Sequence, residues 1–237
     1  MKKASIYLIP NLLGDEANIN ASIPSHNIEI ISSLRHFVVE HIKDARRFLV
    51  KIGLKDLINQ SEFFELNNQS DPRAAYDIIQ VAAEGNDMGI ISDAGCPGIA
   101  DPGAGVVHLA HQKGMRVVPL IGPSSILLAV MASGFNGQSF AFNGYIDRDK
   151  SRRASVIRFL EEKASKENQT QVLMETPYRN EALFDDLINT LNPNTLLSIA
   201  CDISLPTEYI KTRKVMDWKK EPKQNLQKRP AIFSISA

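Results

Sequence analysis

Short apolar segments alternate with amphipathic segments along the first half of the chain. Residues 5–10, 88–92 and 116–120 are brief runs rich in branched apolar side chains, a pattern that predicts buried strands. Residues 26–34 and 72–84 instead space their apolar side chains as one face of a helix does. Strands that alternate with helices predict an α/β fold around a mostly parallel sheet.

The second half of the chain predicts another α/β arrangement with more hairpin character. Strands are expected there at residues 140–145, 170–175, 196–202, 208–215 and 231–235, and helices at residues 150–166 and 183–191. The first half is expected to add a strand at residues 37–40 and helices at residues 45–52 and 106–113. An apolar helix is also expected to run from the Ser124-Ser125 pair to Ala132. We place the domain boundary near Gly122, giving an N-terminal α/β domain (1–122) and a C-terminal α/β domain (123–237).

The charge balance excludes a protein that is basic all over. Lys and Arg total 27 and Asp and Glu total 27, so the formal net charge is zero. Two local clusters remain: residues 35–55 hold six basic residues, and residues 211–229 hold eight. Each cluster fits either a face for a phosphate backbone or an ordinary solvated surface. Trp218, the sole tryptophan, fits either base stacking or packing in a core.

Cysteine content and hydropathy favour a cytoplasmic protein that binds no metal. The two cysteines, Cys96 and Cys201, form no Cys-x-x-Cys pair. The chain carries no segment resembling a signal peptide or a membrane helix. His108 and His111 share a helix face, but no third ligand accompanies them in the sequence, so we interpret them as surface residues.

The strongest chemical signal is the loop at residues 92–103, Ser-Asp-Ala-Gly-Cys-Pro-Gly-Ile-Ala-Asp-Pro-Gly. Glycine and proline after a buried strand give a bare, rigid turn that a ligand can approach closely. The loop lacks the glycine spacing of a dinucleotide or P-loop cradle, which favours a ligand held by backbone amides. Asp101 is expected to fix the turn, whereas Asp93 fits a turn or a ligand contact.

Five segments together resemble a known family. In order along the chain they are residues 9–10 (Ile-Pro), 92–103, 119–125 (Pro-Leu-Ile-Gly-Pro-Ser-Ser), 132–134 (Ala-Ser-Gly) and 175–179 (Glu-Thr-Pro-Tyr-Arg). They resemble the tetrapyrrole methylase superfamily, and within it the ribosomal RNA small-subunit methyltransferase I branch, over nearly the whole chain.

The resemblance implies two α/β domains with S-adenosylmethionine in the cleft between them, a homodimer and no metal. By matched position, the implied donor-binding residues are Pro10, Ser92, Asp93, Ala94, Gly95, Ile99, Ser124, Ser125 and Glu175. The branch methylates the ribose 2′-hydroxyl of a cytidine in small-subunit ribosomal RNA. Cys96 stands where the branch has threonine, so we expect no nucleophilic role for it.

The acceptor side departs from the branch. Its Glu-Asp-Thr-Arg motif is Glu40-His41-Ile42-Lys43 here, and its His-Glu-His-Asn motif is Glu65-Leu66-Asn67-Asn68. Glu40 and His41 are the candidate catalytic residues, because a ribose hydroxyl needs a base or a strong acceptor. The alternative interpretation is that His41 is a solvent-facing residue at a strand end. The candidate RNA-binding residues are Lys43, Arg46 and Arg47.

Three functions remain open from the sequence. The first is an S-adenosylmethionine-dependent methyltransferase acting on ribosomal RNA or the small ribosomal subunit. The second is a methyltransferase for a tetrapyrrole or another small molecule. The third is a donor-binding protein without catalysis. The basic clusters favour RNA, and the altered acceptor motifs keep the other two open.

Overall fold

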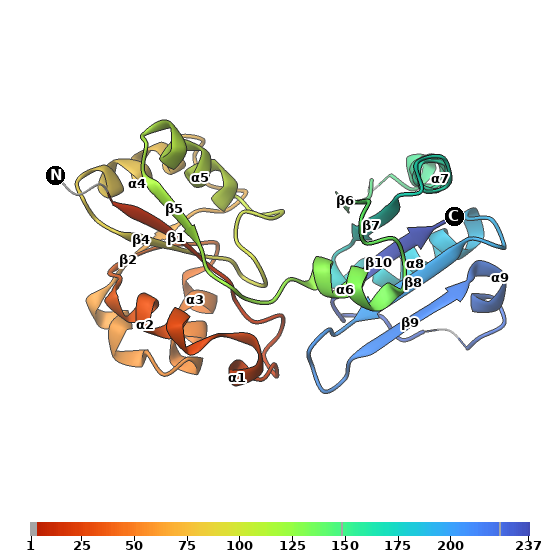
Figure 1. The fold of residues 1–237 in the computed structure, drawn as a ribbon, viewed down its shortest axis with the longest axis horizontal. Coiled ribbons are helices and arrows are strands. Elements are labelled where there is room, and N and C mark those ends of the chain that lie inside the picture. Colours follow the sequence, from red (N-terminus) through yellow and green to blue (C-terminus); the bar gives the residue numbers. More distant parts are fainter. Residues whose placement is uncertain (1–3, 148, 223) are drawn as a thin grey trace. The chain divides into compact units, whose positions relative to one another are not determined.

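The computed structural model describes residues 4–147, 149–222 and 224–237. By its contacts the chain divides into two compact units, Met1–Ser124 and Ser125–Ala237. Each unit is built on its own five-stranded sheet (Figure 1). Within the described ranges, no helix is both long enough and apolar enough to cross a membrane.

The N-terminal unit is a three-layer α/β/α arrangement. Its strands are β1 (Ser5–Ile9), β2 (His36–Val39), β3 (Glu62–Glu65), β4 (Met88–Ile91) and β5 (Arg116–Pro119). They pair in the order β3-β2-β4-β1-β5, and every pairing is parallel. All their carboxyl ends therefore meet at one edge of the sheet, as the sequence predicted for this half.

Helices cover both faces of this sheet. They are α1 (Ile19–Ser22), α2 (Ser25–Ser33), α3 (Ile42–Lys51), the 3-10 helix η1 (Lys55–Gln60), α4 (Ala74–Ala83) and α5 (Gly103–Gln112). Helices α4 and α5 pack on one face, and α2 and α3 lie on the other (Figure 1). Because both faces are covered, strands such as Met88–Ile91 are apolar throughout rather than alternating.

Several helix boundaries differ from the sequence expectation for local reasons. Helix α3 begins at Ile42 rather than Ala45, because the His41 carbonyl already accepts bonds from the Asp44 and Ala45 amides. Helix α4 begins at Ala74 rather than residue 72, because Asp71 holds a turn through its side chain and carbonyl. Elements α1, η1 and β3 were not predicted from the sequence.

The C-terminal unit has a mixed sheet, ordered β6-β7-β10-β8-β9. Its strands are β6 (Phe140–Tyr145), β7 (Thr170–Met174), β8 (Leu196–Cys201), β9 (Tyr209–Lys214) and β10 (Ala231–Ser236). Strands β6 and β7 are parallel, whereas β10 pairs antiparallel with β7 and β8, and β8 with β9. The expected hairpin character is thus confirmed.

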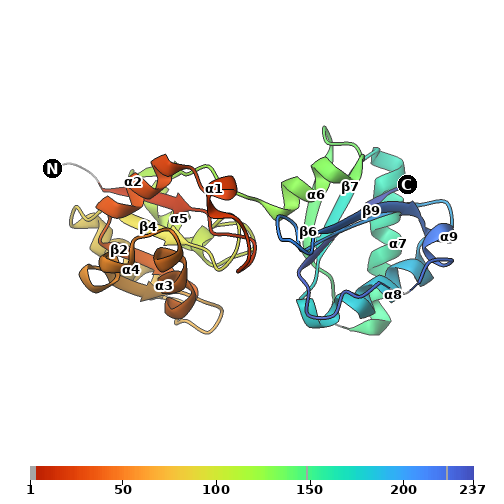
Figure 2. The ribbon, with the colours of Figure 1, turned by 90° about the horizontal axis from the view of Figure 1, so that it is seen from below.

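Alternating side chains of β10 separate two layers of helices. The helices of this unit are α6 (Ser125–Ser133), α7 (Lys150–Glu167), the 3-10 helix η2 (Pro177–Arg179), α8 (Asn180–Thr190) and α9 (Val215–Trp218). Ala231, Phe233 and Ile235 join the apolar core beneath α7 and α8, while α6 covers the opposite face (Figure 2).

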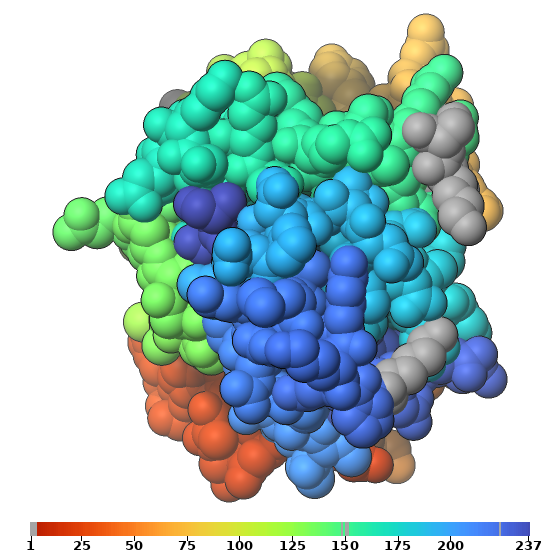
Figure 3. Space-filling model, turned by 90° about the vertical axis from the view of Figure 1, so that its right-hand side faces the viewer, coloured from red at the N-terminus to blue at the C-terminus, as the bar shows by residue number. Residues whose placement is uncertain are grey.

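A shallow pocket lies where the end of the chain meets α7. Ala237, residues 192–195 and helix α7 line it, and Figure 3 shows the C-terminal segment in the darkest blue between teal and lighter blue parts of the chain. Beneath them, Glu161 accepts bonds from the Asn192 amide at 2.7 Å and from the Thr195 hydroxyl at 2.5 Å. Glu161 therefore pins the loop before β8 to helix α7.

Candidate functional site

The candidate site of the N-terminal unit forms at the carboxyl ends of three neighbouring strands. Strand β4 lies between β2 and β1, so the segments after these strands meet: Glu40-His41 after β2, residues 92–103 after β4, and residues 10–15 after β1. The strand order reverses direction here, and open α/β sheets bind ligands at such a point.

Asn11 fastens the loop after β1 to the loop after β4. Its backbone exchanges two hydrogen bonds with Gly95, at 2.9 and 3.1 Å. Its side-chain amide donates to the carbonyls of Ser92 at 3.0 Å and Asp93 at 3.1 Å. Gly95 has a φ of +69°, a conformation that suits glycine. Asn11 was not among the site residues predicted from the sequence, although an asparagine directly after a strand-ending proline is a turn signal.

Asp101 shapes the remainder of this loop. One carboxylate oxygen accepts from the backbone amides of Gly98 and Gly103, both at 2.8 Å. Burial raises the pKa of this carboxyl group, against the opposing effect of those two bonds. The expectation that Asp101 fixes a turn is therefore confirmed.

The structure brings together the expected donor residues of the N-terminal unit at this loop. Pro10 ends β1 and packs so tightly on Gly122 that a Cβ at position 122 would lie 2.4 Å from the Pro10 ring. Ala94 and Ile99 are exposed, and Ser92 is buried. Ser124 lies beside the Cys96 thiol, whose pKa is raised by burial, in keeping with a non-nucleophilic cysteine.

Two expected donor residues belong to the C-terminal unit. Ser125 begins α6, and Glu175 directly follows β7. Glu175 is buried, accepts from the Thr176 amide at 2.7 Å and pairs with Arg179. Its Oε2 is buried without a partner among the residues that the structure describes, so it keeps one acceptor available.

Glu40 and His41 both bond to the loop after β4. The Glu40 carboxylate accepts from the Asp93 amide at 3.1 Å and from the Ser92 hydroxyl at 3.4 Å. Burial raises the pKa of Glu40. The Nδ1 atom of His41 lies 2.6 Å from Oδ2 of Asp93. That hydrogen bond and the Asp93 charge raise the pKa of the imidazole.

His41, Asp44 and Asp93 place nitrogen and oxygen atoms within 4.8 Å of one another. Such atoms are able to ligate a metal. Here the His41 ring is hydrogen-bonded to the Asp93 carboxylate, and the Arg47 guanidinium lies 3.5 Å from the Asp44 carboxylate. We therefore interpret this group as an ion-pair cluster.

The expected RNA-binding residues lie on the outer face of α3. Lys43, Arg46 and Arg47 are all exposed. The Arg46 guanidinium lies 5.4 Å from the centre of the Phe63 ring, while Arg47 pairs with Asp15 at 3.4 Å and Asp44 at 3.5 Å.

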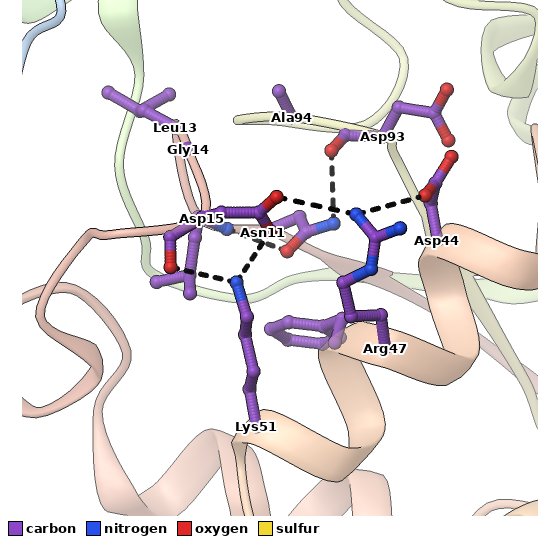
Figure 4. Close-up of a pocket in the computed structure, with 11 residues that line it drawn as sticks. Asn11, Leu13, Gly14, Asp15, Asp44, Arg47, Lys51, Asp93 and Ala94 are labelled. Carbon is purple, nitrogen blue, oxygen red and sulfur yellow. Dashed lines mark hydrogen bonds and ion pairs between the residues drawn. The ribbon is translucent and has the colours of Figure 1, made fainter.

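A pocket of ≈ 210 Å³ opens between α3 and the two loops. Figure 4 shows Lys51 and Arg47 converging on Asp15 at its mouth. Lys51 bonds the Asp15 carboxylate at 2.6 Å and lowers its pKa. The ion pair between Lys51 and Asp15 was not predicted from the sequence, because the two residues lie far apart in the chain.

The second basic cluster is partly paired with carboxylates of its own unit. Glu221 pairs with Lys211 at 2.5 Å and Arg213 at 3.2 Å, and Asp202 pairs with Arg229 at 2.7 Å. Lys223, which belongs to this cluster, lies outside the described residues. Trp218 is buried, and its indole N–H donates to the Leu197 carbonyl at 2.9 Å. The interpretation of Trp218 as a core packing residue is therefore confirmed.

Known proteins resemble the chain over most of its length, although no protein-family model matches it. It is 25% identical to the ribosomal RNA small subunit methyltransferase I of Buchnera aphidicola over 237 residues, 99% of this chain and 79% of that one. It is 30% identical to the protein of the same name from Thermotoga maritima over 164 residues, 69% of this chain and 71% of that one.

A solved structure shares the fold. The methyltransferase CobJ superposes with a TM-score of 0.63 at 15% identity, over 98% of this chain and 92% of that one. The two-sheet α/β architecture expected from the sequence is therefore confirmed. The agreement in sequence with the Thermotoga and Buchnera proteins goes further than the fold: the chain belongs to the ribosomal RNA small subunit methyltransferase I family and is a methyltransferase of the tetrapyrrole methylase superfamily.

Proposed function

We propose that this chain transfers a methyl group from S-adenosylmethionine to the ribose 2′-hydroxyl of a cytidine in small-subunit ribosomal RNA. The observation that carries the proposal is the similarity to ribosomal RNA small subunit methyltransferase I over 99% of the chain. The geometry of the loop after β4 and the basic face of α3 support it.

The loop after β4 fits the methyl donor. Ala94 is exposed on a bare stretch of backbone, and Asn11 and Asp101 hold the flanking turns in place. Such a loop can present peptide groups to the donor without rearrangement. The donor supplies an already activated methyl group on a sulfonium, so the protein has chiefly to align the two reactants. The proposed donor residues are those expected from the sequence apart from Asp93, whose carboxylate bonds the His41 ring.

The exposed face of α3 fits the acceptor. Lys43 and Arg46 present positive charge without a carboxylate partner within 4.0 Å among the described residues. Arg47 and Lys51 share Asp15, so a phosphate could replace that carboxylate at the mouth of the pocket. Glu40 and His41 stand on the same side of the unit, where α3 begins.

The family resemblance further supports a cytoplasmic homodimer. Met131 on α6 and Ile121 just before it are 76% and 79% exposed, and large apolar side chains of this kind are ones that a second copy would cover. Sedimentation velocity tests the dimer: a single species of monomer mass at micromolar concentration would contradict it.

The function is tested by methyl transfer in vitro. Labelled S-adenosylmethionine is incubated with small ribosomal subunits from cells in which the gene for this chain is deleted, and the labelled nucleotide is identified by mass spectrometry. We expect label on a single cytidine ribose. Transfer only to a tetrapyrrole acceptor would favour the small-molecule function, and donor binding without transfer would favour a non-catalytic protein.

Ala94→Leu is expected to weaken S-adenosylmethionine binding by at least about tenfold, or about 1.4 kcal/mol. The larger side chain would project from the exposed loop after β4 into the space proposed for the donor. Isothermal titration calorimetry measures the change. Ala83→Leu adds the same bulk at an exposed position at the end of α4 and serves as the control. Position 94 suits this test better than Gly95, whose positive φ makes any side chain there strained.

The double variant Lys43→Glu/Arg46→Glu is expected to weaken association with small ribosomal subunits while leaving donor affinity unchanged. The slope of log affinity against log salt should fall by about one for each phosphate that the protein no longer neutralises. Filter binding between 50 and 200 mM salt, roughly the range over which such effects show, measures it. Arg116→Glu is the control, because Arg116 begins β5 at the opposite edge of the sheet. An unchanged slope would remove α3 from the RNA interface.

A further inference from the structure

Two dipeptides far apart in the sequence are cross-bonded at the candidate site. Glu40 and His41 follow β2, and Ser92 and Asp93 follow the neighbouring strand β4. Glu40 accepts from the Asp93 backbone, while the Asp93 side chain bonds the His41 ring. These two bonds hold the dipeptides against each other and together set the orientation of the His41 imidazole.

The His41 ring is held on one side and open on the other. Its Nδ1 lies 2.6 Å from Asp93 Oδ2, and its side chain is 56% exposed. The Nε2 atom has no hydrogen-bond partner among the residues the structure describes. An imidazole whose Nδ1–H donates to a carboxylate carries its lone pair on Nε2, the tautomer that can accept a proton.

We propose that His41 and Asp93 form a dyad in which His41 Nε2 accepts the proton of the acceptor hydroxyl and Asp93 positions the ring. The proposal rests on the proposed function, because it assigns the base for that reaction. It gives Asp93 a positioning role in place of the donor contact expected from the sequence.

The step is balanced without any further reactant. The ribose oxygen forms a bond to the methyl carbon as the carbon–sulfur bond breaks, its proton passes to His41 Nε2, and the sulfonium leaves as a neutral thioether. The imidazolium, stabilised by the Asp93 carboxylate, then releases its proton to solvent. A positioned base of this kind contributes about 10²- to 10⁴-fold to a rate.

Glu40 is less suited to this role. Its Oε1 already accepts from the Asp93 amide at 3.1 Å and lies 3.4 Å from the Ser92 hydroxyl. The Glu40 side chain is also half-buried, whereas the His41 side chain is 56% exposed, so an approaching hydroxyl reaches the imidazole more readily. Its bonds instead hold the loop that carries Asp93.

The charges around His41 set the direction of its pH dependence. Asp93, Asp44 of α3 and Glu65 of β3 all raise the pKa of the imidazole, and desolvation opposes them only in part. His41 is then a base only above a pKa higher than its ordinary value of about 6.5. The methyl-transfer rate should therefore rise with pH through that raised pKa. Removing the Asp93 charge should move the rise to lower pH.

The test compares His41→Gln and Asp93→Asn with the wild-type chain. The readouts are donor affinity by calorimetry, the pH dependence of transfer to small ribosomal subunits, and the NMR titration of the His41 ring. His26→Gln and Glu29→Gln are matched controls, because these residues form an exposed histidine–carboxylate pair, 3.2 Å apart, on α2.

We expect His41→Gln to lose about 10²-fold or more of the transfer rate with unchanged donor affinity. Asp93→Asn should lower the NMR pKa of His41 and shift the rate profile to lower pH, also with unchanged donor affinity. The controls should behave as wild type.

Other outcomes separate the dyad from the proposed function. An active wild-type chain whose His41→Gln variant remains fully active overturns the dyad alone. An Asp93→Asn variant that loses donor binding, with its rate profile unmoved on the pH axis, returns Asp93 to the donor site and also overturns the dyad. A wild-type chain that binds the donor but transfers nothing to the subunits overturns the proposed function, and the dyad's assignment as its base with it.

Discussion

Replacing Trp218 by alanine is expected to lower the free energy of unfolding of the C-terminal unit by roughly 3–5 kcal/mol. The side chain is 2% exposed. Its ring meets Phe184 edge to face, with centroids 5.5 Å apart, and its N–H donates to the Leu197 carbonyl. The substitution leaves a cavity between α8, α9 and β8 and deprives a buried carbonyl of its donor.

Urea denaturation followed by circular dichroism measures this loss. Trp218→Phe should lie between wild type and alanine, because it restores part of the packing but not the hydrogen bond. Tyr178→Ala, at an aromatic residue of the same unit that is 75% exposed, should change stability by less than about 0.5 kcal/mol. If Trp218→Ala keeps its stability but loses affinity for ribosomal RNA, base stacking and not packing is the role of this residue.

The main elements of both units could be predicted from the sequence because burial of a strand or helix determines which of its positions are apolar. Met88–Ile91 is apolar at every position since helices cover both faces of its sheet, and so short an apolar run between turn residues predicts a buried strand. The elements that were not predicted have a weaker hydrophobic pattern. Strand β3, Glu62–Glu65, is an edge strand with a glutamate at each end, so its pattern resembles an exposed loop.

The candidate site could be predicted in part for a similar reason. The loop at residues 92–103 could be recognised from its glycines and prolines, because they all lie in one short stretch of sequence. The bonds from Asn11 to Gly95, from Lys51 to Asp15 and from His41 to Asp93 join residues that only the strand order brings together. Their geometry depends on β4 lying between β1 and β2, which no local pattern encodes.

Gly122 illustrates how a residue outside the chemistry sets the geometry of the site. It lies after β5, against Pro10 at the end of the neighbouring strand β1. A Cβ added to Gly122 would lie 2.4 Å from Cβ and 2.7 Å from Cγ of Pro10. The proline ring cannot rotate away as a flexible side chain would, so the end of β1 has to move instead.

Gly122→Ala is therefore expected to cost about 1–3 kcal/mol of stability in the N-terminal unit and to weaken S-adenosylmethionine binding by displacing Pro10. Thermal denaturation and calorimetry measure the two effects. Gly105→Ala is the matched control: among the described residues a Cβ there meets only Ala75, at 4.0 Å, and in helix α5 the substitution should add up to about 1 kcal/mol of stability. Lower stability with intact donor affinity would remove Pro10 from the donor site. No change in either quantity would contradict the close packing of Gly122 on Pro10.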